Sequence, residues 1–266
     1  MKLGDVAKLQ RGDFYVTKRY FEYVTGPRNL EQERDALQQI MTRGPRIRTN
    51  TYSASGAGRC LRERQLSFIG AKKALIDEKS ANIFANGDYV HLRHQVAGLI
   101  QGYITEAEVS VRNEQWNLTG TMDGMLDNGR GLELKSINMR GFDQISMYGP
   151  KADHILQIHS YMLASGLDRF QLVYENKNDQ RLKEFEVVRD ETLIKKVVEE
   201  LKILQEAEKA HVLLPMLADC VVQTGTTYSW CQYRKSCPVS RFTSPQERKP
   251  PIRVQSMGTA LSTPSS

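Results

Sequence analysis

The chain has 266 residues, of which 40% are hydrophobic and 26% charged, a composition typical of a globular protein. This length suits one large domain with appendages, and a second independent core is not expected. No apolar run approaches the length that spans a bilayer, and the first residues lack the apolar core of a signal peptide. We therefore expect an intracellular protein, cytoplasmic or nucleoid-associated, without a membrane partner.

The net charge is +6, and the basic excess is concentrated over residues 43–64, where Glu63 is the single acid. Such a concentration predicts a polyanionic partner, and a solvated basic face is the alternative. The basic residues of this stretch are Arg43, Arg46, Arg48, Arg59, Arg62 and Arg64.

The hydrophobic periodicity predicts alternating helices and strands after an extension of unknown role over residues 1–50. Helices are expected over residues 29–42, shortly after Cys60, and over 80–102, 152–165 and 190–212. Strands are expected over residues 105–112, 117–126, 131–138, 170–174 and 185–188. This order predicts an α/β fold with a mixed central sheet flanked by helices. Residues 241–266 are rich in Ser, Thr and Pro, which predicts a disordered tail.

A hairpin in the middle of the chain brings acidic and basic side chains together. Asp127-Asn128-Gly129 lies between two apolar-rich runs, and Asn-Gly is a strong hairpin signal. In such a hairpin Asp123 faces Glu133, while Glu133 and Lys135 share one face because side chains alternate along a strand. Two carboxylates on one surface are costly unless a cation neutralises them.

This arrangement suits metal-dependent hydrolysis of a phosphodiester. Asp123 and Glu133 supply the hard oxygen ligands that Mg²⁺ or Mn²⁺ prefers. Lys135 would lie beside the scissile phosphate, where it orients the attacking water and offsets charge. The Glu-x-Lys spacing recurs at Glu175 and Lys177, so ordinary surface charge is the alternative interpretation.

Further candidates lie on either side of the hairpin. His91 and His94 compete for one face of the helix over 80–102, and either can instead be a half-buried structural histidine. Gln157 and Tyr161 lie one turn apart on the helix over 152–165 and therefore share a face. Glu108, at the start of the first of the three strands, is interpreted as an edge charge, with a further acidic ligand as the alternative.

The cysteines have three interpretations, because disulfides are not expected in an intracellular protein. Three of them lie in one C-terminal stretch, and the fourth lies far upstream. Buried free thiols and a zinc site are two alternatives, although the short-spaced cysteine pair of a structural zinc site is absent from the sequence. An iron–sulfur cluster accepts thiolates from distant segments. The cysteines are Cys60, Cys220, Cys231 and Cys237.

The motifs together resemble the RecB-like nucleases of the PD-(D/E)xK superfamily. The likeness rests on Gly87-x-x-x-His91, Asp123, Glu133-x-Lys135 and Gln157-x-x-x-Tyr161 in this order, and it covers about residues 53–238. The cysteines make the chain similar to the branch of CRISPR-associated adaptation exonucleases and AddB, in which four cysteines hold a cluster. The chain departs from the pattern in placing ten residues between Cys220 and Cys231, where the family has two.

The resemblance implies a restriction-endonuclease-like core over residues 51–240 with a cysteine-clasped iron–sulfur subdomain. Its implied metal ligands are His91, Asp123, Glu133 and the backbone carbonyl of Leu134. Lys135 is the implied catalytic lysine, and Gln157 and Tyr161 would contact DNA or buttress that lysine. Arg59, Arg62 and Arg64 are the implied DNA-binding arginines. Cys60, Cys220, Cys231 and Cys237 are the implied ligands of a 4Fe-4S cluster, which is favoured over zinc.

The predicted function is that of a metal-dependent DNA exonuclease acting at DNA ends or on single strands. Its partners would be DNA and, in repair or recombination, other proteins or further copies of the chain. The alternatives are a catalytically silent DNA-binding or scaffold subunit and a structure-specific endonuclease.

Overall fold

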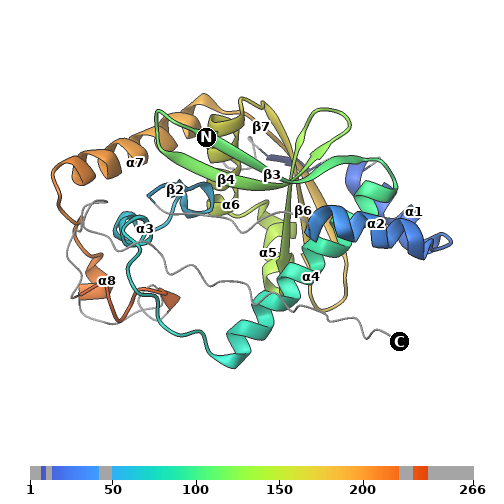
Figure 1. Ribbon diagram of the computed structural model, residues 1–266, viewed down its shortest axis with the longest axis horizontal. Helices are drawn as coiled ribbons and strands as arrows, with labels where there is room; N and C mark the ends of the chain where they lie inside the picture. Colours follow the sequence, from blue (N-terminus) through green and yellow to red (C-terminus); the bar gives the residue numbers. More distant parts are fainter. Residues whose placement is uncertain (1–6, 10–13, 42–49, 222–229, 239–266) are drawn as a thin grey trace, which may run out of the picture.

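A computed structural model describes residues 7–9, 14–41, 50–221 and 230–238 of the chain (Figure 1). Within these ranges the chain forms a mixed α/β fold around one seven-stranded sheet, with the strand order β1-β7-β6-β5-β4-β2 and with β3 on β4. The strands are β1 (Ala7–Leu9), β2 (Tyr52–Ser53), β3 (Ile104–Asn113), β4 (Leu118–Leu126), β5 (Gly131–Ile137), β6 (Arg169–Asn176) and β7 (Leu182–Val188). The predicted tail over residues 241–266 lies outside the described residues.

Helices flank the sheet, as the sequence predicts (Figure 1). They are α1 (Tyr15–Thr25), α2 (Leu30–Met41), the 3-10 turn η2 (Ala54–Gly56), α3 (Leu61–Phe68), α4 (Glu78–Ile100), α5 (Met139–Tyr148), α6 (Ala152–Ser165), α7 (Glu191–Lys209) and α8 (Ala218–Val221). None of the helices in the described residues has the length and apolar character needed to cross a membrane.

Alternation along the central strands separates two cores. Leu132 and Leu134 of β5 are buried together with Val16 of α1 in a smaller cluster. The opposite face of the sheet carries a larger cluster, in which Leu172 of β6 packs with Ile158 of α6 and other apolar residues. Glu133 and Lys135 lie on this second face, because neighbours along a strand point to opposite sides. They therefore interrupt a face that is otherwise apolar.

Most predicted elements are confirmed within two or three residues, including the hairpin turn at Asp127-Asn128-Gly129. The described elements that the periodicity did not predict are β1, β2, α1, η2, α5 and α8. The first two are only three and two residues long, too short to show a period. For α5 the signals were present: the Asn138 side chain caps the helix by accepting from Gly141 N–H, and Gly149, with φ 86°, ends it.

The described part of residues 1–50 is attached to the sheet. β1 pairs antiparallel with β7. The buried carboxylate of Glu184 accepts hydrogen bonds from the backbone N–H of Val16 at 3.1 Å and of Thr17 at 3.0 Å. These are N–H groups at the start of α1, where no carbonyl of the same helix is available. Glu184 thus fixes the first turn of α1 against β7.

One edge of β4 is left open in its middle. β3 pairs with β4 along its full length. On the opposite edge β2 pairs at Leu118 and Thr119, whereas β5 pairs at Gly124 and Met125. The described ladders leave residues 120–123 without a strand partner on that edge. The backbone and side chains of this segment are therefore accessible to other groups.

Helix α6 approaches the open segment closely. A Cβ atom added to Gly120 would lie 2.6 Å from Cε1 of Tyr161 and 3.0 Å from Cβ of Ala54. Only glycine leaves room for this approach. The position of α6 against β4 therefore depends on the absence of a side chain at residue 120.

Candidate active site

A cleft of about 450 Å³ lies over the open segment of β4, between α4 and α6. The six residues that the hairpin and helix motifs single out all line it, although they come from four separate elements. They are His91 of α4, Asp123 of β4, Glu133 and Lys135 of β5, and Gln157 and Tyr161 of α6.

The Asp123 side chain accepts a backbone hydrogen bond from β5 where β4 and β5 no longer pair with each other. Its Oδ2 accepts a hydrogen bond from Leu134 N–H at 2.7 Å, and its Oδ1 lies 3.1 Å from Nδ1 of His91. Burial opposes ionisation of this carboxyl, but the charge and hydrogen bond of His91, the Leu134 N–H and Lys135 together hold its pKa below the usual range. Asp123 is therefore a carboxylate at neutral pH.

Glu133 and Lys135 form an ion pair, with Nζ 2.6 Å from Oε1 of Glu133. Glu133 is only 2% exposed, and burial, reinforced by the charge of Asp123 and opposed by Lys135, raises its pKa to about 7. Burial acts to lower the pKa of Lys135, but Glu133 outweighs it and the pKa is raised. Lys135 therefore stays an ammonium, while Glu133 exchanges its proton near neutrality.

Gln157 and Tyr161 hold this ion pair in position. Oε1 of Gln157 accepts a hydrogen bond from Nζ of Lys135 at 3.0 Å, while its Nε2 donates to Oε1 of Glu133 and to the Tyr161 hydroxyl, each at 2.8 Å. The hydroxyl of Tyr161 in turn donates to the carbonyl of Thr121 at 2.9 Å. A continuous hydrogen-bond chain therefore links the lysine to the open edge of β4.

His91, and not His94, faces the cleft. His94 is 1% exposed, its Nε2 lies 2.8 Å from Oε2 of Glu175, and its ring stacks on Tyr20 with centroids 4.1 Å apart. Burial lowers the pKa of His94, which favours a neutral ring. His94 therefore anchors α4 to β6.

The repeated Glu-x-Lys spacing at Glu175 and Lys177 is a structural feature. Glu175 is buried, ion-paired with Arg93 and hydrogen-bonded to His94, both on α4. Lys177 lies outside the strand, where its Nζ donates to the carbonyl of Ile83 at 3.3 Å. The spacing alone does not distinguish this pair from Glu133 and Lys135. The two pairs differ in their contacts, because Glu133 pairs with Lys135 itself whereas Glu175 pairs with residues of α4.

Two residues of the cleft were not assigned to it by the sequence. Glu108 has φ 56°, in the left-handed region that a glutamate rarely adopts, and it lines the cleft. Gln95, which is buried on α4, donates from Nε2 to Oε1 of Glu108 at 2.8 Å and to the carbonyl of Asp123 at 2.9 Å. Among the described strands β3 pairs only with β4, so Glu108 lies on an edge strand and also lines the cleft; the edge charge and the further acidic ligand both stay predictions. The irregular register near the start of β3 had no sequence signal that could have revealed it.

The predicted DNA-binding arginines differ in their surroundings. Arg62 donates to the carbonyl of Leu214 at 2.6 Å, and to the carbonyl and Sγ of Cys237 at 2.9 and 3.1 Å. Arg64 is buried and donates to Glu200 at 2.8 Å, whereas Arg59 is exposed and donates to Glu63 at 3.2 Å. Their predicted contacts with DNA remain predictions.

The four cysteines line one small cavity of about 30 Å³ between α3 and the C-terminal segment. The cavity has room for about a water-sized group. Burial raises the pKa of Cys231, to which the neighbouring Cys237 and Cys60 also contribute. In their present positions, no three or more His, Cys, Asp or Glu side chains of the described residues are arranged to hold a metal ion.

The acid pair nevertheless fits a divalent cation chemically. Asp123 and Glu133 are oxygen donors of the kind that hard cations prefer. Oε2 of Glu133 is buried and has no hydrogen-bond partner, which is costly for a carboxylate. The Lys135 ammonium supplies the neighbouring positive charge, 2.6 Å from the other oxygen. Since no three His, Cys, Asp or Glu side chains of the described residues are arranged to hold a metal ion, these side chains would have to move for a cation to bind.

The comparisons with known proteins gave structural likenesses only. No known family model matches the chain, and no curated protein sequence matches it. An alkaline exonuclease from Laribacter hongkongensis, also solved in complex with dAMP, shares 15% identity with a TM-score of 0.49, over 68% of this chain and 93% of that one. The protein SSO0001 shares 19% identity with a TM-score of 0.45, over 82% and 98%. A phage-related exonuclease from Haemophilus somnus 129PT shares 15% identity with a TM-score of 0.40, over 55% and 78%.

The hydrogen-bond chain predicts that two buried tyrosine hydroxyls contribute different amounts to the free energy of unfolding. Tyr161→Phe removes the bond to Thr121 and leaves a Gln157 N–H unpaired, so we expect a loss of about 1–2 kcal/mol in the free energy of unfolding. Tyr103→Phe is the matched control, because its buried hydroxyl has no partner within the described residues. Urea unfolding should show a change below about 0.5 kcal/mol for this control. Equal losses in the two variants would contradict the network.

Proposed function

We propose that the chain is a metal-dependent DNA nuclease of the PD-(D/E)xK type, acting as an exonuclease at DNA ends or on single strands. The observation that carries the proposal is the buried pair of Asp123 and Glu133 beside Lys135, with one unpartnered Glu133 oxygen in the cleft. Support for DNA as the substrate comes from the family resemblance of the motifs and the basic charge of the chain.

In this proposal Asp123, Glu133 and His91 hold Mg²⁺ or Mn²⁺, together with the backbone carbonyl of Leu134. Such a cation lowers the pKa of water and stabilises charge that develops on phosphate. A histidine ligand favours Mn²⁺ somewhat over Mg²⁺. The hydrogen bond from Leu134 N–H to Oδ2 orients the Asp123 carboxylate toward the cleft.

Lys135 acts in this proposal as a fixed positive charge. Its raised pKa keeps the proton on Nζ, so it binds and neutralises phosphate oxygens and does not act as the proton acceptor. Gln157 fixes the direction of Nζ through the 3.0 Å hydrogen bond, which limits the entropy lost when phosphate binds. Glu133, with a pKa of about 7 in the metal-free chain, has to release its proton before its carboxylate can hold the cation.

Two rival functions share this geometry. A silent DNA-binding or scaffold subunit in a repair or recombination complex would keep the cleft without cleaving. A structure-specific endonuclease would cleave without needing an end. The intact set of acids and lysine favours catalysis over the first rival, and the choice of substrate distinguishes the second.

Cleavage should depend on Asp123 and Lys135. We expect Asp123→Asn and Lys135→Met to lower the Mn²⁺-dependent cleavage rate at least about 100-fold, because each removes charge at the reacting phosphate. The matched control is Lys177→Met, since Lys177 follows the same Glu-x-Lys spacing outside the cleft. Folding of each variant is checked by circular dichroism.

A folded Asp123→Asn protein that cleaves at the parent rate would rule out the proposed nuclease site. End-labelled linear DNA and closed circular DNA are compared in the same assay. Cleavage of the closed circle at the linear rate would favour the endonuclease, and tight binding without any cleavage would favour the scaffold subunit.

Cation binding should weaken in acid. Below about pH 7 Glu133 is protonated, so a cation has to displace a proton, and we expect the Mn²⁺ affinity measured by calorimetry to fall up to about tenfold per pH unit. Above this pH the profile should flatten, because Asp123, with its lowered pKa, is already ionised. His91, whose pKa is raised although burial opposes this, loses its proton on the same rise in pH and steepens the profile.

Glu133→Gln provides the control for this pH profile. The amide cannot ionise, so the variant should bind Mn²⁺ more weakly at high pH and should show a flatter profile. In the metal-free protein, a pKa raised to about 7 means that the contribution of Glu133 to stability is largest below about pH 4.5 and is lost as pH rises through 7. An unchanged pH profile in Glu133→Gln would contradict this assignment.

We also propose that Cys60, Cys220, Cys231 and Cys237 hold a 4Fe-4S cluster that joins α3 to the C-terminal segment. The support is that all four line one cavity and that Arg62 donates a hydrogen bond to Sγ of Cys237, a contact that stabilises a thiolate. Because the cavity measures only about 30 Å³, the three segments that carry the cysteines have to move apart to admit a cluster. A single zinc ion or free thiols need less room and are the alternatives.

Protein purified without oxygen should distinguish these alternatives. We expect a broad absorption band at the blue end of the visible range, with iron and acid-labile sulfide in equal amounts. Cys220→Ser should reduce the iron content if the distant cysteine is a ligand. A colourless protein that contains zinc, or no metal, would refute the cluster.

A further inference from the structure

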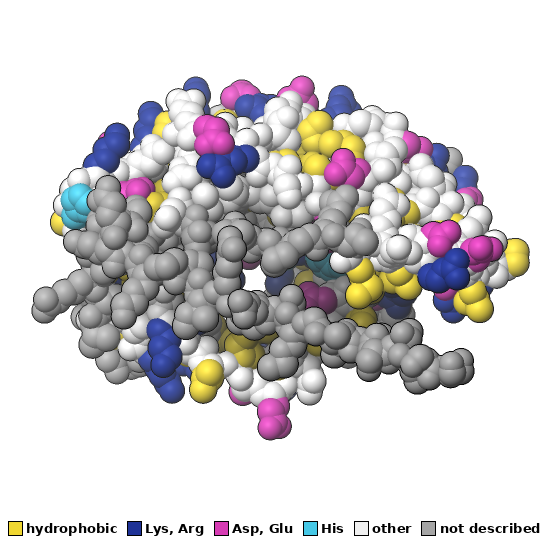
Figure 2. All heavy atoms as spheres, viewed as in Figure 1, with side chains coloured by type: hydrophobic (Ala, Val, Ile, Leu, Met, Phe, Trp, Pro, Cys, Tyr) yellow, Lys and Arg dark blue, Asp and Glu magenta, His cyan; other side chains and the backbone are white. Residues whose placement is uncertain are grey.

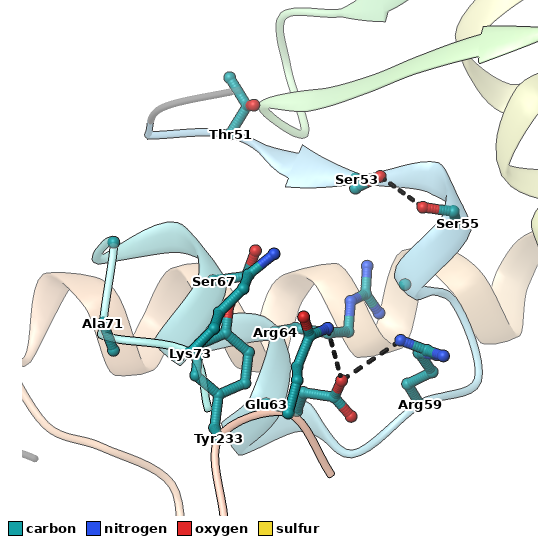
Figure 3. A pocket seen from close by; sticks show the side chains of 13 residues that line it. Thr51, Ser53, Ser55, Arg59, Glu63, Arg64, Ser67, Ala71, Lys73 and Tyr233 are labelled. Carbon is teal, nitrogen blue, oxygen red and sulfur yellow. Dashed lines mark hydrogen bonds and ion pairs between the residues drawn. The ribbon is translucent and has the colours of Figure 1, made fainter. Parts of the chain in front are cut away.

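A second cavity of about 420 Å³ lies beneath β2, next to the cleft. Ser53 and Ser55 line both cavities, so a ligand that extends past them from the cleft enters the second cavity. Figure 3 shows these two serines on one side of the space and the side chains of α3 and Tyr233 on the other. We call this space the Arg64 cavity, after the buried arginine that lines it.

Positive charge exceeds negative charge in its lining. Arg59, Arg64 and Lys73 are the cations, and Glu63 is the one acid among the lining residues that the structure describes, which leaves an excess of two positive charges (three minus one). Both Arg59 and Lys73 are exposed, and the Lys73 Nζ lies 6.0 Å from the ring centre of Tyr233. The remaining polar side chains are hydrogen-bond donors, namely Thr51, Ser53, Ser55, Ser67 and Gln232.

Arg64 provides an independent sign of a missing anion. Its side chain is 4% exposed, and its Nη1 donates to Glu200 at 2.8 Å. Its Nε and Nη2 are buried and have no acceptor within the described residues. Figure 3 shows the guanidinium directed from α3 toward the turn of Ser55. Unpaired buried donors are unfavourable, so an oxyanion that enters from the adjoining cavity and reaches these two nitrogens would stabilise this arginine.

Phosphate is the oxyanion that best matches this lining. Guanidinium groups bind tetrahedral phosphate oxygens through paired N–H donors, and the serine and threonine hydroxyls add further donors. A divalent cation is disfavoured by the positive excess. On the face in Figure 2, both basic and acidic side chains are scattered over the described surface. The Arg64 cavity is therefore a local concentration of positive charge.

We infer that the Arg64 cavity is a second phosphate-binding site, which holds a backbone or terminal phosphate of the same DNA strand whose scissile bond lies in the cleft. This inference rests on the proposed nuclease function. The shared wall of Ser53 and Ser55 connects the two sites, so a phosphate held here fixes the register of the strand over Asp123 and Lys135. Free inorganic phosphate has the same chemistry and is the other source that a test has to separate.

The test measures binding without cleavage. A fluorescein-labelled single-stranded oligonucleotide is titrated by anisotropy in EDTA over a range of salt concentrations. For the double variant Arg59→Gln/Lys73→Met we expect about tenfold weaker binding. The slope of log K against log salt should fall by about 0.7, since the site holds one phosphate and each neutralised phosphate on a single strand contributes about 0.7.

Lys195→Met serves as the matched control, because Lys195 is an exposed lysine of α7 that lines neither cavity. Its salt slope should equal that of the parent. Glu63→Gln should tighten binding, because it removes the single acid and frees Arg59 from the 3.2 Å contact. The inference is overturned if the double variant keeps the parent slope, or if Lys195→Met lowers the slope as much.

Competition by inorganic phosphate at constant ionic strength tests whether the loss of oligonucleotide binding arises in the Arg64 cavity. Phosphate should compete with the oligonucleotide in the parent and much less in the double variant; equal competition in both would place phosphate elsewhere. Failure of the two proposals is distinguishable. A parent that binds with the steep slope but never cleaves rules out the nuclease alone, whereas a parent that cleaves while the double variant binds normally rules out this site alone.

Discussion

The open edge of β4 is the constraint on which the rest of the site depends. β2 and β5 share one edge of β4 but pair with it only at its two ends, so the backbone of residues 120–123 needs other partners. The Asp123 carboxylate accepts the Leu134 N–H, and the Tyr161 hydroxyl donates to the Thr121 carbonyl. Buried backbone groups have to be satisfied. The same bonds that close the sheet therefore also hold the acid and the tyrosine at the cleft.

Local sequence signals predicted the parts of the fold that repeat regularly. The hydrophobic periodicity predicted the bounds of α6 and α7 to within three residues, and the Asn-Gly turn predicted the position of the β4–β5 hairpin. The alternation along β5 put Glu133 and Lys135 on one face, and the structure shows them 2.6 Å apart. These predictions succeeded because each depends on residues close together in the chain.

Other features depend on contacts between distant segments, which no local pattern records. His91 and His94 are equivalent in the sequence, and only Glu175 on β6 and Asp123 on β4 distinguish them. The turned backbone at Glu108 and the pairing of Gln95 with two strands were equally invisible. The raised pKa of Glu133 arises from burial and from the charge of Asp123, against the opposing effect of Lys135, so it could not be read from composition.

Helix α4 fixes the relative positions of several side chains that contact the sheet. Within five consecutive residues it places His91 at Asp123, Arg93 and His94 at Glu175, and Gln95 at both Glu108 and the carbonyl of Asp123. Each added residue turns an α-helix by about 100°. One insertion or deletion inside this turn would therefore rotate every later side chain away from its strand. A change of chain length in a loop such as the tip of the β4–β5 hairpin would leave these contacts in place.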